Sequence, residues 1–284
     1  MSYKNPDALV TTAWLAEHLN DPGIRIVDGS SFLPNVPRDA HAEYLAKHIP
    51  GAVLVDIEEC CDRTSSLPHM LPKAEDFAAM MGARGIANAH KVVVYDSQGV
   101  RTSPRIWWMF RVFGHDNVVV LDGGLPKWEA EGKPLASGEE TPAPATFKAS
   151  FRPEMVRSIE QMIANLQSHA ELVIDARPAG RFAGSAPEPR PGIPSGHMPG
   201  SVSMPVELVV DNATGCVLPA EAIAANFEKI GVAVGKPAVT TCGSGVAACT
   251  TALGLFLLGQ KDVPVYDGSW SEWGARADTA KRKA

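Results

Sequence analysis

The chain has 284 residues, of which 45% are hydrophobic and 20% are charged, and its formal net charge is −6. This composition is typical of a globular protein that is long enough for two domains, and it excludes an intrinsically disordered chain. The acidic balance gives no general attraction to nucleic acid or to an anionic membrane surface, so we expect neither as a partner.

The sequence shows no signal for secretion, for membrane insertion or for a disulfide framework. Residues 1–10 lack the apolar stretch of a signal peptide, and the longest apolar run, 246–258, is too short to cross a bilayer. The five cysteines make an odd number, and neither they nor the eight histidines have the spacing of zinc ligands. We therefore expect a cytoplasmic protein without a bound metal.

The first half of the chain predicts helices that alternate with short apolar strands. Thr12 begins a helical pattern in which Trp14, Leu15 and Leu19 share one face. Four segments have the composition of buried strands, and they cover residues 25–28, 52–55, 92–95 and 118–121. Strands that alternate with helices favour a parallel sheet with helices on both faces, which is an α/β fold.

The second half predicts the same order of elements. Ser158 begins its first helix, and Gln161, three residues later, completes the pattern of a capping box. Strands are expected at 172–175, 201–204, 238–241 and 263–266. Because proline cannot donate a hydrogen bond to a neighbouring strand, Pro264 predicts that the last strand is short or lies at an edge of its sheet.

Matched motifs in the two halves indicate a tandem duplication. The turn His-x-Pro-Gly occurs at 48–51 and again at 197–200, and other short motifs recur at nearly the same offset. We predict an N-terminal domain over residues 1–131 and a C-terminal domain over residues 152–284. Residues 132–151, rich in proline and small residues, are predicted to be a linker that crosses the surface of both domains.

The segment around Cys242 combines a strand, a tight loop and a helix. The strand at 238–241 ends at Cys242, and the helical pattern follows a loop that contains Gly243 and Gly245. Backbone N–H groups at the start of a helix favour a thiolate over a thiol, and the glycines let these groups converge on the sulfur. We therefore predict that Cys242 is a nucleophile, although a lone cysteine is more often a buried packing residue.

Each half has a loop of this kind, but the cysteine occurs only in the second. Alignment of the Gly-Val pairs at 99–100 and 245–246 places Asp96 where Cys242 stands. A carboxylate cannot replace a thiolate nucleophile, so the N-terminal domain is predicted to be catalytically inactive. The loop after Cys242 contains no arginine to bind phosphate oxygens, which makes phosphatase chemistry an unfavourable interpretation.

The duplication and the motif Cys-Gly-Ser-Gly-Val at 242–246 resemble the two-domain sulfurtransferases of the rhodanese superfamily. The resemblance covers essentially the whole chain, and the motif is closest to that of the 3-mercaptopyruvate sulfurtransferases. Members that use thiosulfate typically carry Arg and Lys after the cysteine. The resemblance implies that Gly243, Ser244, Gly245 and Val246 bind the substrate beside the nucleophile.

The resemblance also implies a site for the carboxylate and the keto oxygen of the substrate. The segments 180–184 and 187–190 are similar to a family segment whose two arginines bind these groups, which identifies Arg181 and Arg190. Two guanidinium groups on one loop would select a planar anion by its geometry. From the residues alone, two solvated surface arginines are an equally good interpretation.

A proton relay is the third feature that the resemblance implies. His69 and an acid before it are similar to a family arrangement in which Ser244, a histidine and a carboxylate pass a proton. The spacing favours Glu58 as the acid, and Asp56 is the alternative. From the residues alone, His69 is more typical of a plain turn residue.

The resemblance implies a sulfurtransferase that carries sulfur from 3-mercaptopyruvate through a Cys242 persulfide and releases pyruvate. The acceptor would be thioredoxin, a small thiol or, in an assay, cyanide, and no cofactor is required because sulfur itself is the electrophile. Three alternatives remain open: a thiosulfate:cyanide sulfurtransferase, a persulfide carrier without a small-molecule substrate, and a protein with two inert loops. The adjacent Cys60 and Cys61 are by default expected to be partly buried and inert, and the sequence leaves open whether Cys60, Cys61 and Cys249 have redox roles.

Overall fold

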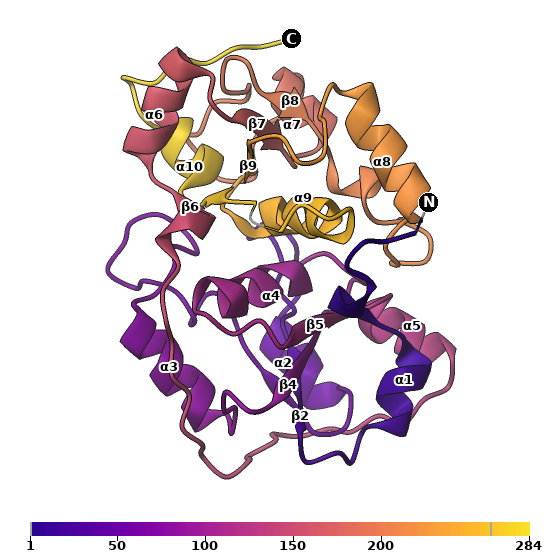
Figure 1. Cartoon of the computed structure of the whole chain (residues 1–284). Helices are drawn as coiled ribbons and strands as arrows, with labels where there is room; N and C mark the ends of the chain where they lie inside the picture. The colour runs from indigo at the N-terminus through magenta and orange to yellow at the C-terminus, as the bar shows by residue number, and fades with distance from the viewer. Residues whose placement is uncertain (1, 262) are drawn as a thin grey trace.

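The computed structural model describes residues 2–261 and 263–284 of the chain. The two halves of the chain lie one above the other, each with its own sheet (Figure 1). Each sheet has five strands, and every neighbouring pair of strands is parallel. The predicted α/β fold with a parallel sheet in each half is therefore confirmed.

The first sheet has the strand order β1-β5-β4-β2-β3. Its strands are β1 (Leu9–Val10), β2 (Ile24–Asp28), β3 (Ala52–Leu54), β4 (Lys91–Tyr95) and β5 (Val118–Leu121). The α-helices of this half are α1 (Thr12–Glu17), α2 (Ala40–Ala46), α3 (Ala74–Ala83), α4 (Ser103–Val112) and α5 (Gly124–Ala130). A short 3-10 helix, Pro6–Ala8, precedes β1.

The second sheet repeats this arrangement with the order β6-β10-β9-β7-β8. Its strands are β6 (Val156–Arg157), β7 (Leu172–Asp175), β8 (Val202–Ser203), β9 (Ala238–Thr241) and β10 (Val265–Tyr266). The α-helices are α6 (Ile159–Ser168), α7 (Ala179–Ala183), α8 (Ala220–Lys229), α9 (Val246–Leu257) and α10 (Ser269–Trp273). Two further 3-10 helices cover Pro153–Met155 and Val206–Leu208.

Local signals in the sequence account for several of these boundaries. Ser158 caps α6, and Gln161 completes the predicted capping box through its side chain. Helix α1 begins at Thr12, as predicted, and Thr11 caps it, because the Thr11 hydroxyl accepts a hydrogen bond from the N–H of Trp14.

The sequence prediction was incomplete at the first strand of each half and at β10. The two-residue strands β1 and β6 lie at the edges of their sheets and are too short to produce a pattern. Strand β10 is short, as Pro264 predicted, but it lies between β6 and β9 and is not an edge strand. The sheet tolerates the proline because Pro264 precedes the paired residues and its carbonyl accepts a hydrogen bond from Thr240.

Helices cover both faces of each sheet. In the first half, one buried cluster joins the sheet to α1 and α5, and another joins it to α3 and α4. In the second half, α6 and α10 pack on one face, while α8 and α9 pack on the other. The core that contains α3, α4, α8 and α9 continues from one half into the other, so the two halves bury a common apolar surface.

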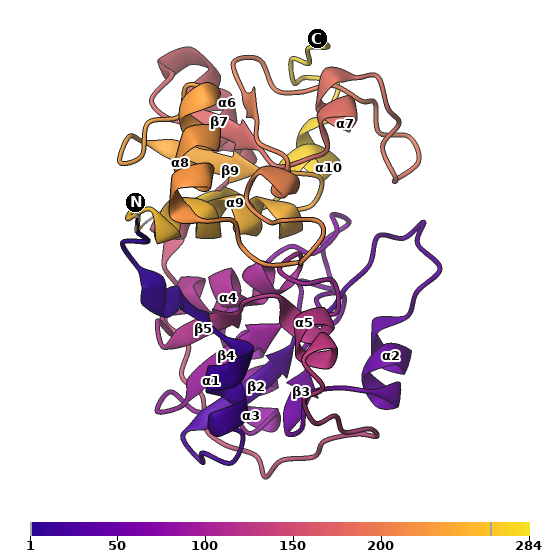
Figure 2. The ribbon, with the colours of Figure 1, turned by 90° about the vertical axis from the view of Figure 1, so that its right-hand side faces the viewer.

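Helices α4 and α9 form the centre of the contact between the halves (Figures 1 and 2). The rings of Trp107 and Phe256 meet edge to face with their centroids 5.3 Å apart. Thr250 donates a hydrogen bond from its hydroxyl to the carbonyl oxygen of Arg101. This contact fixes the start of α9, and with it the loop after Cys242, against the first half.

The segment 132–151 runs along the first half for most of its length, whereas the prediction has it cross the surface of both domains. It pairs with His48 through an antiparallel bridge at Ala136. Farther along, Ala145 donates to the carbonyl of Gly82, and Ser150 donates to that of Phe113. The sequence pattern could not show this because all these contacts join residues that are distant in the chain.

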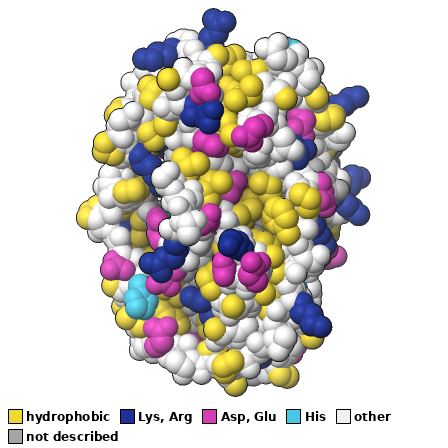
Figure 3. Space-filling model, turned by 90° about the vertical axis from the view of Figure 1, so that its left-hand side faces the viewer, with side chains coloured by type: hydrophobic (Ala, Val, Ile, Leu, Met, Phe, Trp, Pro, Cys, Tyr) yellow, Lys and Arg dark blue, Asp and Glu magenta, His cyan; other side chains and the backbone are white. Residues whose placement is uncertain are grey.

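The surface carries charges of both signs. Figure 3 shows basic and acidic side chains interspersed on the face that it presents, with apolar side chains between them. This mixture agrees with the modest negative net charge of the chain.

A buried carboxylate in the first half predicts an unusual dependence of stability on pH. Asp28 lies at the end of β2 and accepts hydrogen bonds from the N–H and hydroxyl of Ser30. Burial raises the pKa of Asp28 to about 6, so the folded protein binds this proton more tightly than the unfolded chain does. The contribution of Asp28 to stability therefore falls as the pH rises from about 4 to about 6.

We expect Asp28→Asn to raise the free energy of unfolding at pH 7 by up to about 3 kcal/mol, because an amide does not ionise and so avoids the free-energy cost of a buried carboxylate. The gain should be small at pH 4.5, where the wild-type carboxyl is protonated in the folded state. Urea unfolding of the wild-type protein and the variant at pH 4.5 and pH 7 measures this gain in stability. An equal gain at both pH values would contradict the raised pKa of Asp28.

Candidate active site

Cys242 lies at the carboxyl end of β9, directly before the loop that leads into α9. Gly245 takes a backbone φ of 77°, which a residue with a side chain rarely adopts. The Cys242 side chain is 2% exposed, and it lines a cavity of about 260 Å³ whose walls come from both halves. Cys242 therefore lies where ligands usually bind in a parallel α/β sheet, in a cavity outside the carboxyl ends of the strands.

In the first half, the loop that corresponds to the Cys242 loop surrounds Asp96, the counterpart of Cys242, with backbone amides. The carboxylate of Asp96 accepts hydrogen bonds of 2.9 Å from the backbone N–H groups of Gln98, Arg101, Thr102 and Ser103. These four amides converge on a single anionic side chain. By the duplication, we expect the amides of residues 244 and 247–249 to surround the side chain of Cys242.

The structure brings Ser244, His69 and Glu58 together in a hydrogen-bonded series. Nδ1 of His69 lies 2.9 Å from Oγ of Ser244, and its Nε2 lies 2.7 Å from Oε1 of Glu58. The hydrogen bond from His69 lowers the pKa of the Glu58 carboxyl. The alternative acid, Asp56, instead accepts a hydrogen bond from the N–H of Glu58. An ionised Glu58 orients the imidazole so that Nδ1 faces the serine hydroxyl.

Arg105, on α4, holds the second half and the His69 loop in place. Its Nη1 donates to Oδ1 of Asp267 at 2.7 Å and to the carbonyl of Gly245 at 3.3 Å. Its Nη2 donates to the carbonyl of His69 at 2.5 Å, and the other oxygen of Asp267 accepts from the N–H of Leu71. His69 has a φ of 60°, a left-handed conformation that these contacts stabilise.

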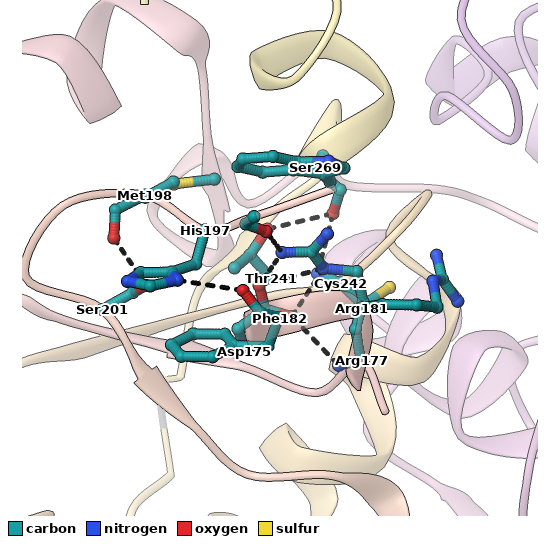
Figure 4. Close-up of polar contacts among 12 residues, drawn as sticks. Asp175, Arg177, Arg181, Phe182, His197, Met198, Ser201, Thr241, Cys242 and Ser269 are labelled. Carbon is teal, nitrogen blue, oxygen red and sulfur yellow. Dashed lines mark hydrogen bonds and ion pairs between the residues drawn. The ribbon is translucent and has the colours of Figure 1, made fainter. Parts of the chain in front are cut away.

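Arg181 and Arg190 both line the cavity with Cys242. Arg181 projects from α7, and Figure 4 shows its guanidinium and the sulfur of Cys242 pointing to the same side. A Cβ atom at position 243 would lie 2.9 Å from Nη2 of Arg181, so Gly243 leaves room for this side chain. Burial lowers the pKa of Arg190, an effect opposed by Glu58 and Cys242, which lie near it.

Sequence reasoning missed the groups that support these residues. Glu188 forms ion pairs with Arg177 and Arg181, and Arg105 joins the halves. The one local signal was the acid between prolines in the segment 187–190. The pairing of Arg105 with Asp267 has no signal in a single sequence, because the two residues are far apart in the chain.

The other described cysteines lie outside the cavity lining. Burial raises the pKa of Cys60 to about 12, and burial also raises the pKa of Cys61 and of Cys216. Cys249 is fully buried in α9, where burial again raises the pKa of its thiol. These thiols are protonated at neutral pH and are poor nucleophiles.

The described residues form neither a metal-binding cluster nor a membrane-spanning helix. No cluster of three or more His, Cys, Asp or Glu side chains in residues 2–261 and 263–284 could hold a metal ion. Within the same ranges, no helix has the length and apolar character needed to span a membrane.

Comparison with known proteins identifies the family. The rhodanese-like domain model matches residues 11–131 and 158–276. Human 3-mercaptopyruvate sulfurtransferase is 47% identical over 276 residues, which is 95% of this chain and 93% of the human protein. Bovine thiosulfate sulfurtransferase is 44% identical over 278 residues, with coverage of 95% and 93%.

A solved structure shows the same arrangement of two domains. The crystal structure of SseA from Escherichia coli, described as a 3-mercaptopyruvate sulfotransferase with the rhodanese fold, superposes with a TM-score of 0.85. It is 39% identical in sequence, and the match covers 93% of this chain and 99% of that chain. The model match in both halves, the identity to full-length relatives and this superposition lead to one conclusion: the chain belongs to the rhodanese family of sulfurtransferases.

Proposed function

We propose that the chain transfers the sulfur of 3-mercaptopyruvate to a thiol acceptor through a persulfide on Cys242. The observation that carries the proposal is one cavity that is lined by Cys242, by Arg181 and Arg190, and by the hydrogen-bonded pair of His69 and Ser244. The relatives named for this activity support the same reaction. The loop Cys-Gly-Ser-Gly-Val supplies only amides and a hydroxyl near the sulfur, which suits a donor with a single carboxylate.

The first step moves the sulfur from the donor to the protein. The Cys242 thiolate attacks the donor sulfur, the bond between that sulfur and the methylene carbon breaks, and its electron pair passes into the enolate of pyruvate. Arg181 and Arg190 bind the carboxylate and the developing enolate oxygen, whose negative charge they stabilise. The protein then carries a Cys242 persulfide.

Ser244 and His69 supply the proton that completes pyruvate. The Ser244 hydroxyl protonates the methylene carbon, the His69 imidazolium returns a proton to the Ser244 oxygen across their 2.9 Å contact, and Glu58 stabilises the imidazolium. Solvent then protonates His69 again. Such positioned proton transfer typically contributes about 10²–10⁴-fold to a rate.

The second step removes the outer sulfur. An acceptor thiolate attacks it, the sulfur–sulfur bond breaks, and Cys242 leaves as the thiolate that begins the next cycle. Reduced thioredoxin, a small thiol or cyanide can supply the nucleophile. The protein needs no cofactor for either step. The N-terminal domain is proposed to be catalytically inactive because Asp96 holds the loop amides that would otherwise surround a thiolate. A cytoplasmic location remains a prediction.

A persulfide carrier is the rival that a substitution of the arginines can exclude. Replacing Arg181 and Arg190 with alanine should lower kcat/KM for 3-mercaptopyruvate by about 10²-fold or more, because the carboxylate loses two charge-assisted contacts. Steady-state pyruvate release measures this loss. Arg276→Ala, which removes an exposed arginine paired with Asp278, is the matched control and should retain full activity.

Unchanged turnover in the double variant would favour the carrier. The thiosulfate:cyanide rival would be favoured if the wild-type protein released sulfite from thiosulfate with a higher kcat/KM than pyruvate from 3-mercaptopyruvate.

A further inference from the structure

A buried network of four charged side chains lies under the proposed donor site. Arg177 forms hydrogen bonds with both oxygens of Asp175 and a 2.7 Å ion pair with Oε1 of Glu188. The other oxygen of Glu188 accepts from Nε of Arg181 at 3.0 Å and from Nη2 of the same residue. The side chains of Asp175, Arg177 and Glu188 are at most 3% exposed, so water screens them little.

Glu188 binds only one edge of the Arg181 guanidinium. The contacts use Nε and Nη2, which lie along the side of the group. Nη1 remains available to the cavity, which Arg181 lines beside Gly243 and Cys242. A guanidinium has five N–H donors in a fixed plane, so binding at one edge determines where the remaining donors point. Glu188 therefore orients the edge that a donor carboxylate would meet.

Glu188 also changes the charge of the site. In the network, Asp175 offsets Arg177 and Glu188 offsets Arg181. Of Arg181 and Arg190, the two arginines proposed to bind the donor, only Arg190 has no hydrogen bond or ion pair to a described carboxylate. It provides the uncompensated positive charge of the two, and the carboxylate of Glu58 reduces its field. Arg181 and Arg190 together consequently present about one net positive charge to the donor instead of two.

We propose that Glu188 is a specificity-determining residue that selects a donor with one negative charge over a donor with two. It holds Arg181 in the orientation that suits a planar carboxylate, and it cancels the additional charge that a dianion such as thiosulfate would require. The inference rests on the proposed sulfur transfer and names the charge class of its donor. Arg181 thus mainly orients the donor carboxylate, and Arg190 mainly attracts it by charge.

The test compares the wild-type protein with Glu188→Gln, which keeps the size of the side chain and an acceptor oxygen but removes the charge. We expect the ratio of kcat/KM for thiosulfate to kcat/KM for 3-mercaptopyruvate to rise by about tenfold or more, because a low-dielectric site no longer repels the second charge. The gain should shrink as the salt concentration rises. Glu228→Gln removes an exposed negative charge from α8, outside the cavity lining, and should change the ratio by less than about twofold.

A second readout keeps the inference separate from the reaction. Calorimetry with sulfate, an inert dianion, and with pyruvate, a monoanion, measures charge selectivity without turnover. In Glu188→Gln the affinity for sulfate should rise relative to that for pyruvate by about tenfold, with thermal unfolding used to show that the variant is folded.

Equal changes for both donors, or an unchanged preference between the two anions, would overturn the inference and leave only a structural role for Glu188. The same is true if Glu228→Gln shifts the ratio as strongly. A wild-type protein that releases neither pyruvate nor sulfite would instead refute the proposed function, and the calorimetric comparison would still decide the role of Glu188.

Discussion

Cys242→Ser is expected to lower pyruvate release from 3-mercaptopyruvate by on the order of 10⁴-fold or more, because a serine hydroxyl cannot form the persulfide that links the two steps. The oxygen is a much weaker nucleophile than a thiolate, and a helix start cannot ionise it at neutral pH. The cavity and its arginines remain, so the variant should still bind the donor. Rapid measurement of pyruvate separates this loss of chemistry from a loss of binding.

Cys61→Ser is the matched control for this substitution. Cys61 is half-buried and does not line the cavity, so its replacement should leave the rate within about twofold of the wild-type rate. Full pyruvate production by Cys242→Ser would remove the nucleophile from the account and would favour a protein whose two loops are both inert.

Arg105→Met is expected to lower the free energy of unfolding by about 3–5 kcal/mol, because it leaves the carboxylate of Asp267 buried without its partner. The side chains of the pair are 1% and 3% exposed, so bulk solvent does not replace the lost guanidinium. The same change releases the carbonyl of His69. The variant should therefore also lose activity at temperatures where it remains folded. Urea unfolding and pyruvate release measure the two effects.

A double variant separates the ion pair from the loss of packing. Asp267→Asn combined with Arg105→Met removes the unpaired charge, so it should recover part of the stability lost by Arg105→Met alone. The amide retains an acceptor for the N–H of Leu71. Additive losses in the double variant would show that the two side chains stabilise the fold independently, which contradicts the coupling seen in the structure.

The sequence predicted the parts of the fold that depend on local pattern. Strands β7, β9 and β5 begin and end at the predicted residues because each is a continuous apolar segment in a buried parallel sheet. The duplication placed Asp96 opposite Cys242, and the structure shows the two residues at corresponding ends of β4 and β9. These predictions were possible because a strand is visible in a few neighbouring residues and because the two halves repeat the same motifs.

The remaining features depend on contacts between distant residues. The linker follows the first half because of hydrogen bonds to residues such as His48 and Gly82, and β10 is central because β6 pairs with its free edge. In the site, spacing favoured Glu58 over Asp56, and the structure places Glu58 against His69. The catalytic roles of these residues remain predictions.

The most direct test of the account is the mass of the peptide that contains Cys242 after the wild-type protein reacts with 3-mercaptopyruvate and no acceptor. We expect this peptide to gain the mass of one sulfur atom, with release of one equivalent of pyruvate and loss of the added mass when a thiol is supplied. An unmodified Cys242 peptide despite pyruvate release, or added sulfur on another cysteine, would contradict the account.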